Sequence, residues 1–353
     1  MSSLIRVLVV DDSAFVRKVV TQMLSRSPFI DVVGTARDGD EALEMAARLD
    51  PDVVTLDLVM PGVDGLEFLR RQMAVRRVPV VVCSISHESG AAALEAFELG
   101  AVEFIQKPTA LATDRVYEIA DELVAKVKTA AAARTSVQPN RPSSVEPAPS
   151  VTRPEAAAAP LEAKNVDMVV IGVSTGGPQA LRRVIPLLAP DFPVPVAVVL
   201  HMPVGYTTMY AQRLNDVSRV HVVEANDGDR ITPGSMFLAP AGRHLLLVRN
   251  AEGEVRARLD VRPFDTPHRP AVDVLFRSAA DVFGSRVLGV IMTGMGNDGL
   301  IGAAYIKAKG GQIITEAESS CVVYGMPRAV VEAALSDRVA PLDDMAATIL
   351  GML

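Results

Sequence analysis

Short apolar runs alternate with amphipathic stretches through the first 110 residues of the chain. Residues 5–10, Ile-Arg-Val-Leu-Val-Val, predict a strand that is largely buried on both faces. Apolar side chains then recur at helical spacing as far as Leu24. Strands that alternate with helices in this way indicate a parallel sheet covered on both faces. The alternation predicts further strands at 32–33, 52–57, 78–83 and 102–106 and further helices at 42–49 and 65–73.

A second alternation of this kind begins near residue 166 and runs to the end of the chain. Between the two patterned regions, residues 126–165 are rich in proline, alanine and serine, which is typical of a linker because such a segment buries too little apolar surface to fold. The sequence therefore predicts an α/β protein with two doubly wound parallel-sheet domains, residues 4–125 and 166–353, joined by a Pro/Ala-rich linker. The second region has predicted strands at 168–171, 194–200, 287–292 and 312–315 and helices at 179–188, 272–281, 301–309, 330–334 and 345–352.

The composition agrees with two globular domains and argues against several classes of protein. A chain of 353 residues is long for one domain, and 49% hydrophobic with 22% charged residues suits two apolar cores. The net charge of −7 disfavours nucleic-acid binding, which requires a basic surface. No apolar run approaches the ~18 residues that cross a bilayer, so we expect a cytoplasmic protein without membrane insertion. Cys83 and Cys321 lie in apolar surroundings and are expected to be buried thiols.

Polar side chains follow the strands of the first region at the points where the strands end. They are Asp11, Asp12, Asp57, Ser84 and Lys107. Because the carboxyl ends of parallel strands share one edge of the sheet, we expect these five side chains to converge there. Three carboxylates close together favour a Mg²⁺ ion among them. A carboxylate beside Mg²⁺, with a hydroxyl and an ammonium group nearby, is suited to accept a phosphoryl group, since these groups neutralise charge on the transferring oxygens.

With these residues in this order, positions 4 to about 125 resemble the flavodoxin-like receiver domain of two-component response regulators. The resemblance implies that Asp57 is the phosphoacceptor, that Asp11 and Asp12 are the acidic pair, and that a histidine kinase donates the phosphoryl group. It also implies that Asp12, Asp57 and the carbonyl of Val59 bind Mg²⁺. The other matching residues are the switch hydroxyl Ser84, the switch aromatic Phe104, the lysine with its cis-proline at Lys107 and Pro108, and the loop 60–65 after the acceptor.

The second region opens with a serine on a glycine-rich turn. Residues 172–176 spell G-x-S-x-G, the pattern that places Ser174 on a sharp turn from strand to helix. His201 and Asp298 each follow another apolar strand, so a parallel sheet would gather the three residues at one edge. His201 can then accept the serine proton as general base while Asp298 fixes its tautomer. Backbone N–H groups of the turn 294–296, or of the helix start near Thr175, can hold the oxyanion.

Other interpretations of this serine remain open from the residues alone. A glycine-rich strand-to-helix turn also binds phosphates and dinucleotides, although the glycines here do not follow G-x-G-x-x-G. An α/β-hydrolase would have the chain order serine, acid, histidine, whereas this chain has serine, histidine, acid. Among the remaining histidines, His268 with Arg269 lies in a loop that can line the cleft. His221 and His244 lie in or beside strand-like segments, where a core or surface role is expected.

In combination and in order, the motifs of the second region resemble the Rossmann-like catalytic domain of chemotaxis protein-glutamate methylesterases. The resemblance implies that Ser174 is the nucleophile, His201 the base and Asp298 the orienting acid. Met295 would stabilise the oxyanion through its backbone N–H. The resemblance further implies hydrolysis of glutamate methyl esters and certain glutamines on the cytoplasmic helices of methyl-accepting chemoreceptors, with a chemotaxis histidine kinase as phosphodonor and no cofactor in the hydrolase site. The matching motifs are residues 171–177, 201–203, 268–270, 293–299 and 321–327.

A receiver in front of a hydrolase suggests regulation, and it also raises rival functions. We hypothesise that receiver and linker obstruct the cleft at rest, and that phosphorylation of Asp57, which puts roughly −1.5 to −2 charges in place of one, repacks Ser84 and Phe104 to open it. A DNA-binding output is disfavoured because residues 166–353 hold 17 Lys and Arg against 19 Asp and Glu. A nucleotide-binding module would leave His201 and Asp298 without a role.

Overall fold

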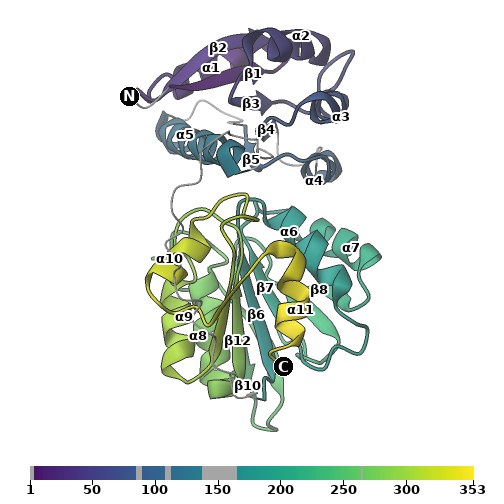
Figure 1. Cartoon of the computed structure of the whole chain (residues 1–353), viewed down its shortest axis with the longest axis vertical. Helices are drawn as coiled ribbons and strands as arrows, with labels where there is room; N and C mark the ends of the chain where they lie inside the picture. The colour runs from purple at the N-terminus through teal and green to yellow at the C-terminus, as the bar shows by residue number, and fades with distance from the viewer. Residues whose placement is uncertain (1–3, 85–89, 108–112, 137–164, 264) are drawn as a thin grey trace, which may run out of the picture.

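The computed structural model describes residues 4–84, 90–107, 113–136, 165–263 and 265–353. These residues form two α/β domains stacked along the long axis of the molecule (Figure 1). Each domain is built on a parallel sheet with helices on both faces, which confirms the fold class predicted from the alternating pattern. No helix among these residues is long and apolar enough to cross a membrane.

The N-terminal domain has five described strands in the order β2-β1-β3-β4-β5, the order of flavodoxin-like folds. Strand β1 is apolar and buried from Val7 to Val10 because both of its faces are covered there. Val7 and Val9 pack with residues of α1 and α5, whereas Leu8 and Val10 pack with residues of α2 and α3. The elements are β1 (Ile5–Val10), α1 (Ala14–Leu24), β2 (Ile30–Ala36), α2 (Gly39–Leu49), β3 (Val53–Leu56), α3 (Gly65–Val75), β4 (Val80–Ser84), α4 (Gly90–Glu98), β5 (Glu103–Gln106) and α5 (Thr113–Ser136).

The helix α5 extends past the domain boundary that the sequence suggested at residue 125. It continues to Ser136, and Val127 and Ala130 are buried in the same core cluster as Leu123. Residues 126–136, expected to be linker, are therefore helical, because alanines favour helix propagation and no proline occurs between Pro108 and Pro139. The rest of the expected linker, 137–164, lies outside the described residues.

The C-terminal domain has seven described strands in the order β14-β13-β12-β6-β7-β9-β8, and all neighbouring strands are parallel. The strand order reverses between β6 and β12, and doubly wound sheets bind ligands at such a switch point. A separate antiparallel hairpin joins β10 to β11. The strands are β6 (Met168–Val173), β7 (Val196–Leu200), β8 (His221–Glu224), β9 (Ser235–Leu238), β10 (His244–Arg249), β11 (Val255–Asp260), β12 (Val287–Ile291), β13 (Gln312–Glu316) and β14 (Arg338–Ala340).

Helices cover both faces of this sheet. Residues of α8 and α9 pack in one cluster, and residues of α6, α7 and α11 pack in the other. The sequence prediction gave no element for α4, α7, β9, β11 or β14, and it noted β8 and β10 only as strand-like segments at or beside His221 and His244. The short strands β8, β9 and β14 have too few positions to reveal a period. The helices are α6 (Gly177–Val184), α7 (Thr207–Val217), α8 (Val272–Phe283), α9 (Leu300–Ala308), α10 (Met326–Glu332) and α11 (Met345–Leu350).

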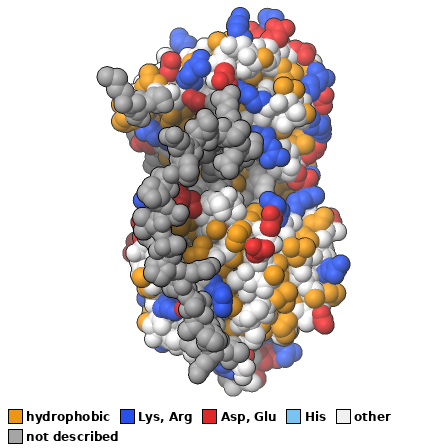
Figure 2. Space-filling model, viewed as in Figure 1, with side chains coloured by type: hydrophobic (Ala, Val, Ile, Leu, Met, Phe, Trp, Pro, Cys, Tyr) orange, Lys and Arg blue, Asp and Glu red, His pale blue; other side chains and the backbone are white. Residues whose placement is uncertain are grey.

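The two domains are joined by an apolar contact as well as by charged side chains. Phe97 and Phe104 belong to the same buried cluster as Leu181, Tyr206 and Leu214 of the C-terminal domain. The rings of Phe104 and Tyr206 meet with their centroids 5.0 Å apart. Figure 1 shows α4 and α5 on the side of the N-terminal domain that faces the other domain. Basic and acidic side chains lie next to each other where the two lobes meet (Figure 2).

Candidate functional site

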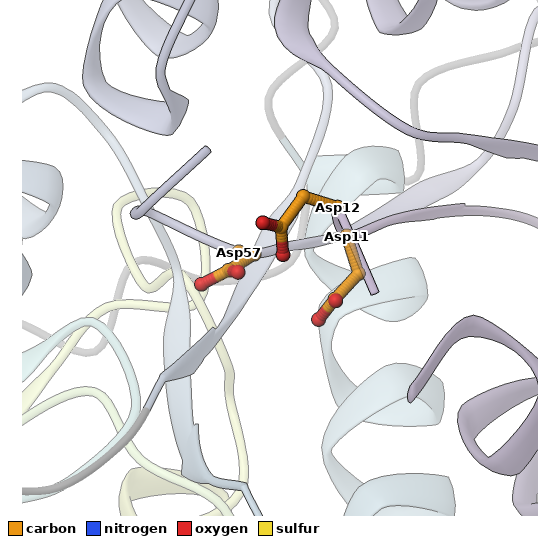
Figure 3. Close-up of side chains that lie close together, drawn as sticks. All are labelled: Asp11, Asp12 and Asp57. Carbon is orange, nitrogen blue, oxygen red and sulfur yellow. The ribbon is translucent and has the colours of Figure 1, made fainter. Parts of the chain in front are cut away.

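Three aspartates meet at the carboxyl edge of the N-terminal sheet (Figure 3). Asp11 follows β1 and Asp57 follows β3, and both are buried, whereas Asp12 is exposed. Their ligand oxygens all lie within 4.8 Å of one another. The backbone N–H of Val59 donates to Asp57 Oδ1 at 3.3 Å, so the following loop folds back onto the acid. A carboxylate trio with one solvent-exposed member fits a Mg²⁺ ion that keeps part of its water shell.

Lys107 places an ammonium group between the two buried carboxylates. Its Nζ lies 2.6 Å from Asp11 Oδ2 and 2.7 Å from Asp57 Oδ2. Burial raises the pKa of Asp57 above its ordinary value, and the hydrogen bond from Lys107 opposes this shift. Burial alone would lower the pKa of Lys107, but its two carboxylate partners raise it. Ser84 is buried at the end of β4, and Pro108, expected to be cis, lies outside the described residues.

A histidine–aspartate pair lies at the carboxyl edge of the C-terminal sheet. His201 follows β7, Asp298 lies in the loop after β12, and His201 Nε2 is 2.8 Å from Asp298 Oδ2. Both side chains are largely buried, at 10% and 6% exposure. With Nε2 bonded to the carboxylate, the proton belongs on Nε2 and the lone pair on Nδ1. Nδ1 is buried and has no hydrogen-bond partner among the described residues, so it is the nitrogen left to accept a proton.

Ser174 lies at the end of β6, on the strand next to that of His201. Its backbone N–H donates to the carbonyl of Thr293 at 3.0 Å, and the His201 N–H donates to the carbonyl of Val173 at 3.1 Å. Within the described part of the chain, no hydrogen bond joins Ser174 Oγ to His201. Catalytic hydrogen bonds are often long in a free enzyme and shorten when substrate binds. The structure thus unites His201 with Asp298 and places Ser174 on the neighbouring strand end.

The N-terminus of α8 holds the carboxylate of Asp298. The Val272 N–H donates to Oδ2 at 2.8 Å, and the Asp273 N–H donates to Oδ1 at 2.9 Å. Burial would raise the pKa of Asp298, but His201 and these two backbone donors lower it below its ordinary value. A helix N-terminus favours negative charge, so the carboxylate is held ionised and in a fixed position beside the imidazole.

The turn after β12 packs directly against Ser174. Gly294 donates to the carbonyl of Val323 at 3.0 Å, and its own carbonyl accepts from Gly325 at 3.1 Å and from Met326 at 2.9 Å. A Cβ at position 294 would lie 2.8 Å from the Cβ of Ser174, which is closer than real contacts allow. Only glycine permits this approach. The segment 321–327, to which the sequence alone assigned no chemistry, therefore fixes the turn beside the serine.

A buried carboxylate also supports the turn after β12. Glu316 ends β13, is fully buried, and accepts the backbone N–H of Thr293 at 2.8 Å and the hydroxyl of Ser320 at 2.9 Å. Burial raises its pKa. Sequence analysis missed Glu316, although the rule that picked out Asp57 and His201, a polar residue at the end of an apolar strand, would have found it.

The other histidines and the cysteines have distinct surroundings. The ring of His268 stacks on that of His201 with centroids 4.1 Å apart. Burial is the main cause that lowers the pKa of His268 to about 4, and the charge of the nearby His201 adds to it. Its neighbour in sequence, Arg269, accepts the Gly242 N–H through its carbonyl. His244 is fully buried and its Nδ1 accepts the Ala271 N–H at 3.1 Å, which is a structural role. As expected, both cysteines are buried, and burial raises the pKa of Cys83 to about 12.

The N-terminal domain covers two of the candidate oxyanion residues. The hydroxyl of Thr175 donates to the carboxylate of Glu103 on β5. The hydroxyl of Thr129 on α5 lies 2.6 Å from the sulfur of Met295. Sequence analysis missed Glu103 and Thr129, because no pattern within one domain reveals which side chains it presents to the other. The N-terminal domain therefore lies against the edge of the C-terminal sheet that carries Ser174.

Known proteins match this chain along almost its whole length. A family model described as "Response regulator receiver domain" matches residues 7–117, and one described as "CheB methylesterase" matches residues 169–349. A Myxococcus xanthus protein named protein-glutamate methylesterase/protein-glutamine glutaminase 5 is 54% identical over 345 residues, which cover 97% of this chain and 96% of that protein. A Symbiobacterium thermophilum protein named protein-glutamate methylesterase/protein-glutamine glutaminase is 47% identical over 351 residues, covering 97% and 95%. The crystal structure of the Thermotoga maritima CheB methylesterase catalytic domain matches with a TM-score of 0.52 and 41% identity, covering 53% of this chain and 99% of that one.

Proposed function

The chain belongs to the family of CheB methylesterases that carry a response regulator receiver domain, and we propose that Ser174, His201 and Asp298 perform its hydrolytic reaction. The activity is hydrolysis of protein glutamate methyl esters and glutamine amides in chemotaxis, regulated by phosphorylation of the receiver. The observation that carries the residue assignment is the buried His201–Asp298 pair, 2.8 Å apart, whose remaining imidazole nitrogen has no partner among the described residues. That nitrogen is the available base.

In the proposed reaction, Nδ1 of His201 takes the proton of Ser174 as Oγ attacks the γ-carbonyl of the substrate. The backbone N–H groups of Met295 and Thr175 hold the tetrahedral oxyanion, and each donor of this kind contributes on the order of 10²–10³ in rate. Collapse of the intermediate expels methanol from an ester, or ammonia from an amide, with His201 returning the proton. Water then attacks the acyl-serine with the same base and releases glutamate. Nucleophile, base and acid all come from the chain, so this chemistry needs no cofactor.

In the receiver, we propose that a chemotaxis histidine kinase phosphorylates Asp57. Asp12, Asp57 and the carbonyl of Val59 would hold Mg²⁺, and Asp11 completes the acidic pocket. When bound, Mg²⁺ supplies positive charge to the phosphoryl oxygens. Lys107, which is already paired with Asp57, adds a second positive group that can follow the phosphoryl oxygens.

The contact between domains supports a model in which the receiver blocks the hydrolase site until it is phosphorylated. Phe104 packs on Tyr206, and Glu103 and Thr129 contact residues next to the nucleophile. We propose that phosphorylation draws Ser84 toward the phosphoryl group and lets Phe104 leave Tyr206, which loosens this contact. The proposed substrates are the cytoplasmic helices of methyl-accepting chemoreceptors, which places the protein in the cytoplasm.

Removing the receiver is expected to raise the resting rate. Residues 160–353 alone should release methanol from methylated chemoreceptor membranes about 5- to 150-fold faster than the unphosphorylated full chain, a range typical of coupling between sites. The full chain should approach that rate when a small phosphodonor and Mg²⁺ are added, and Asp57→Asn should not. Equal rates for the truncated and unphosphorylated proteins would contradict the blocking model, and no methanol release from any of them would contradict the function.

The glycine at position 294 offers a test of the turn beside the serine. A methyl group there would collide with Ser174 and Met326 and displace the oxyanion donors. We expect Gly294→Ala to lower kcat for methanol release about 10- to 100-fold, because a misplacement of about 1 Å at a catalytic site has this effect. Gly351→Ala is the matched control, since a Cβ there meets only an ordinary contact at 3.4 Å. If Gly294→Ala keeps the wild-type kcat, the turn does not position the reacting groups.

A further inference from the structure

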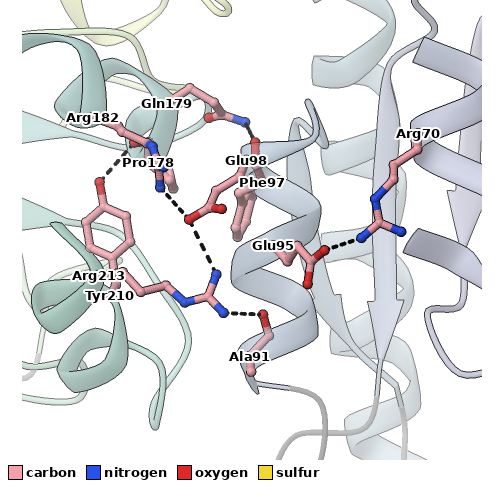
Figure 4. A network of polar contacts seen from close by, with 10 residues as sticks. All are labelled: Arg70, Ala91, Glu95, Phe97, Glu98, Pro178, Gln179, Arg182, Tyr210 and Arg213. Carbon is pink, nitrogen blue, oxygen red and sulfur yellow. Dashed lines mark hydrogen bonds and ion pairs between the residues drawn. The ribbon is translucent and has the colours of Figure 1, made fainter. Parts of the chain in front are cut away.

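One helix of the receiver lies across two helices of the catalytic domain that begin beside the hydrolase site. α6 begins three residues after Ser174, and α7 begins six residues after His201. Figure 4 shows α4 of the receiver lying against this pair. The side chains that hold it come from the outer face of the pair, which we call the α6–α7 face: Gln179, Arg182, Tyr210, Arg213 and Leu214.

The α6–α7 face holds α4 through charge and through backbone carbonyls. The guanidinium groups of Arg182 and Arg213 both bind the carboxylate of Glu98. Arg213 also donates to the carbonyl of Ala91 at 3.1 Å. Gln179 Nε2 donates to the carbonyl of Phe97 at 3.0 Å, at the C-terminal end of α4, and to the carbonyl of Ala101 at 2.5 Å. Contacts of this kind recognise a helix with an acidic side chain, and they do not depend on the rest of its sequence.

The contact is also incompletely filled. Leu94 and Phe97 pack toward Tyr210 and Leu214, yet a cavity of about 330 Å³ remains between α4 and the α6–α7 face. Arg182 and Arg213 keep 43% and 30% of their side chains exposed. The partly exposed arginines and the cavity leave room for the α6–α7 face to bind a helix other than α4.

The chain that follows α4 leads toward the nucleophile. Five residues after the end of α4, Glu103 presents its carboxylate to the hydroxyl of Thr175, which is adjacent to Ser174. Glu103 Oε2 is also 3.4 Å from Lys126 Nζ. The receiver thus presents a helix with an acidic side chain, followed by a glutamate side chain beside the catalytic serine. A helix bearing glutamates is also the proposed substrate, and a glutamate side chain is the product of the reaction.

The geometry points to the α6–α7 face as the docking surface for the substrate: Gln179, Arg182 and Arg213 bind an acidic chemoreceptor helix in the place that α4 occupies at rest. This inference rests on the proposed function. It identifies receiver and receptor helix as competitors for one surface, so the arginines that hold the resting state also bind the substrate in the active state. Charge complementarity supports the receptor helix as occupant, because free carboxylates next to a methyl ester offer the guanidinium groups the same partner as Glu98 does.

The test compares two ways of breaking the same ion pairs in the full chain. Arg182→Gln with Arg213→Gln removes them from the docking surface, and Glu98→Gln removes them from the receiver. Both proteins should show a raised resting rate. With a saturating phosphodonor, the double arginine variant should show a KM for methylated receptor membranes about tenfold higher, as expected for two partly exposed charged contacts, with kcat within twofold. Glu98→Gln should keep the wild-type KM.

Controls separate docking from chemistry and from folding. All variants should hydrolyse a small ester such as p-nitrophenyl acetate at the wild-type phosphorylated rate. Arg286→Gln, which removes an ion pair with Asp167 at the opposite edge of the sheet, should leave the receptor KM unchanged. An unchanged receptor KM in the phosphorylated double arginine variant would overturn the docking surface while leaving the hydrolase intact. Wild-type protein that releases no methanol from receptors would instead overturn the proposed function.

Discussion

Replacing Ser174 by alanine is expected to abolish methanol release from methylated chemoreceptors. The proposed reaction forms a covalent bond to Ser174 Oγ, and alanine has no atom that can form it. Loss of the nucleophile in enzymes with this mechanism lowers kcat by roughly 10⁴–10⁶, which leaves only the contribution of binding and oxyanion donors. The measurement is methanol release by phosphorylated wild type and Ser174→Ala at equal concentration, together with ammonia release from receptor glutamines. Both products should disappear together, because one acyl-serine serves both reactions.

The substitution should leave the protein otherwise intact. Ser174 makes no side-chain hydrogen bond within the described residues, and its backbone N–H still reaches Thr293. Ser174→Ala should therefore match wild type in thermal unfolding and in phosphorylation of Asp57. A variant that keeps more than about a hundredth of the wild-type rate would show that Ser174 is not the nucleophile. Retained ligand binding without any hydrolysis by wild type would favour a phosphate-binding role for the turn 172–177 instead.

The meeting of His201 with Asp298, and that of the three aspartates, could be predicted from the sequence because both clusters follow one physical rule. In a parallel sheet the carboxyl ends of all strands lie at the same edge, so polar residues that directly follow apolar runs are brought together whatever their distance in sequence. Applied to Asp57 and to His201, this rule predicts the edge of the sheet at which each residue meets other polar side chains. It does not predict which atoms meet. The contact of His201 with Asp298 through Nε2 rather than Nδ1 depends on the orientation of the ring, which the sequence pattern does not determine.

The relation between the domains could not be predicted in the same way. Periodicity reports which face of an element is buried, but not whether its own domain or another one buries it. The resemblance to receiver domains marks Phe104 as a switch aromatic, but the pattern does not reveal that it packs on Tyr206 of the other domain. The helix α4 was missed altogether, since its Gly-Ala-Ala-Ala start carries little apolar contrast, and with it the contacts of Glu98.

These contacts link regulation to substrate recognition. If receiver and receptor helix compete for Arg182 and Arg213, phosphorylation need not alter the catalytic residues at all. It has only to weaken the receiver's hold until the receptor helix competes successfully. The resting rate and the receptor KM then depend on the same two side chains. Variants of the docking surface should change both quantities, whereas variants of α4 should change the resting rate and leave the receptor KM unchanged.

Replacing Asp298 by asparagine is expected to lower kcat for methanol release by about 10³–10⁴, with little change in KM for the receptor. The Asp298 carboxylate accepts three N–H groups, from His201 Nε2, Val272 and Asp273. Asparagine offers one oxygen in place of two, so its NH₂ takes either the Oδ2 position, where it faces the imidazole and the Val272 N–H, or the Oδ1 position, where it faces the Asp273 N–H. If it faces the imidazole, it donates to Nε2 and forces the proton onto Nδ1, where the base is needed.

The start of α8 opposes both orientations, because each of them sets the NH₂ group against a backbone N–H, that of Val272 or that of Asp273. An NH₂ group turned toward the Asp273 N–H would set two donors against each other in a buried place, which costs about 1–3 kcal/mol. In either orientation His201 loses the negative charge that stabilises its imidazolium, so the pH profile of kcat should change. Asp281→Asn is the matched control, because Asp281 pairs on the surface with Tyr305 and Lys309, and it should stay within twofold of wild type. If Asp298→Asn keeps more than about a tenth of the wild-type kcat, Asp298 does not set the tautomer of His201, and the base must be assigned anew.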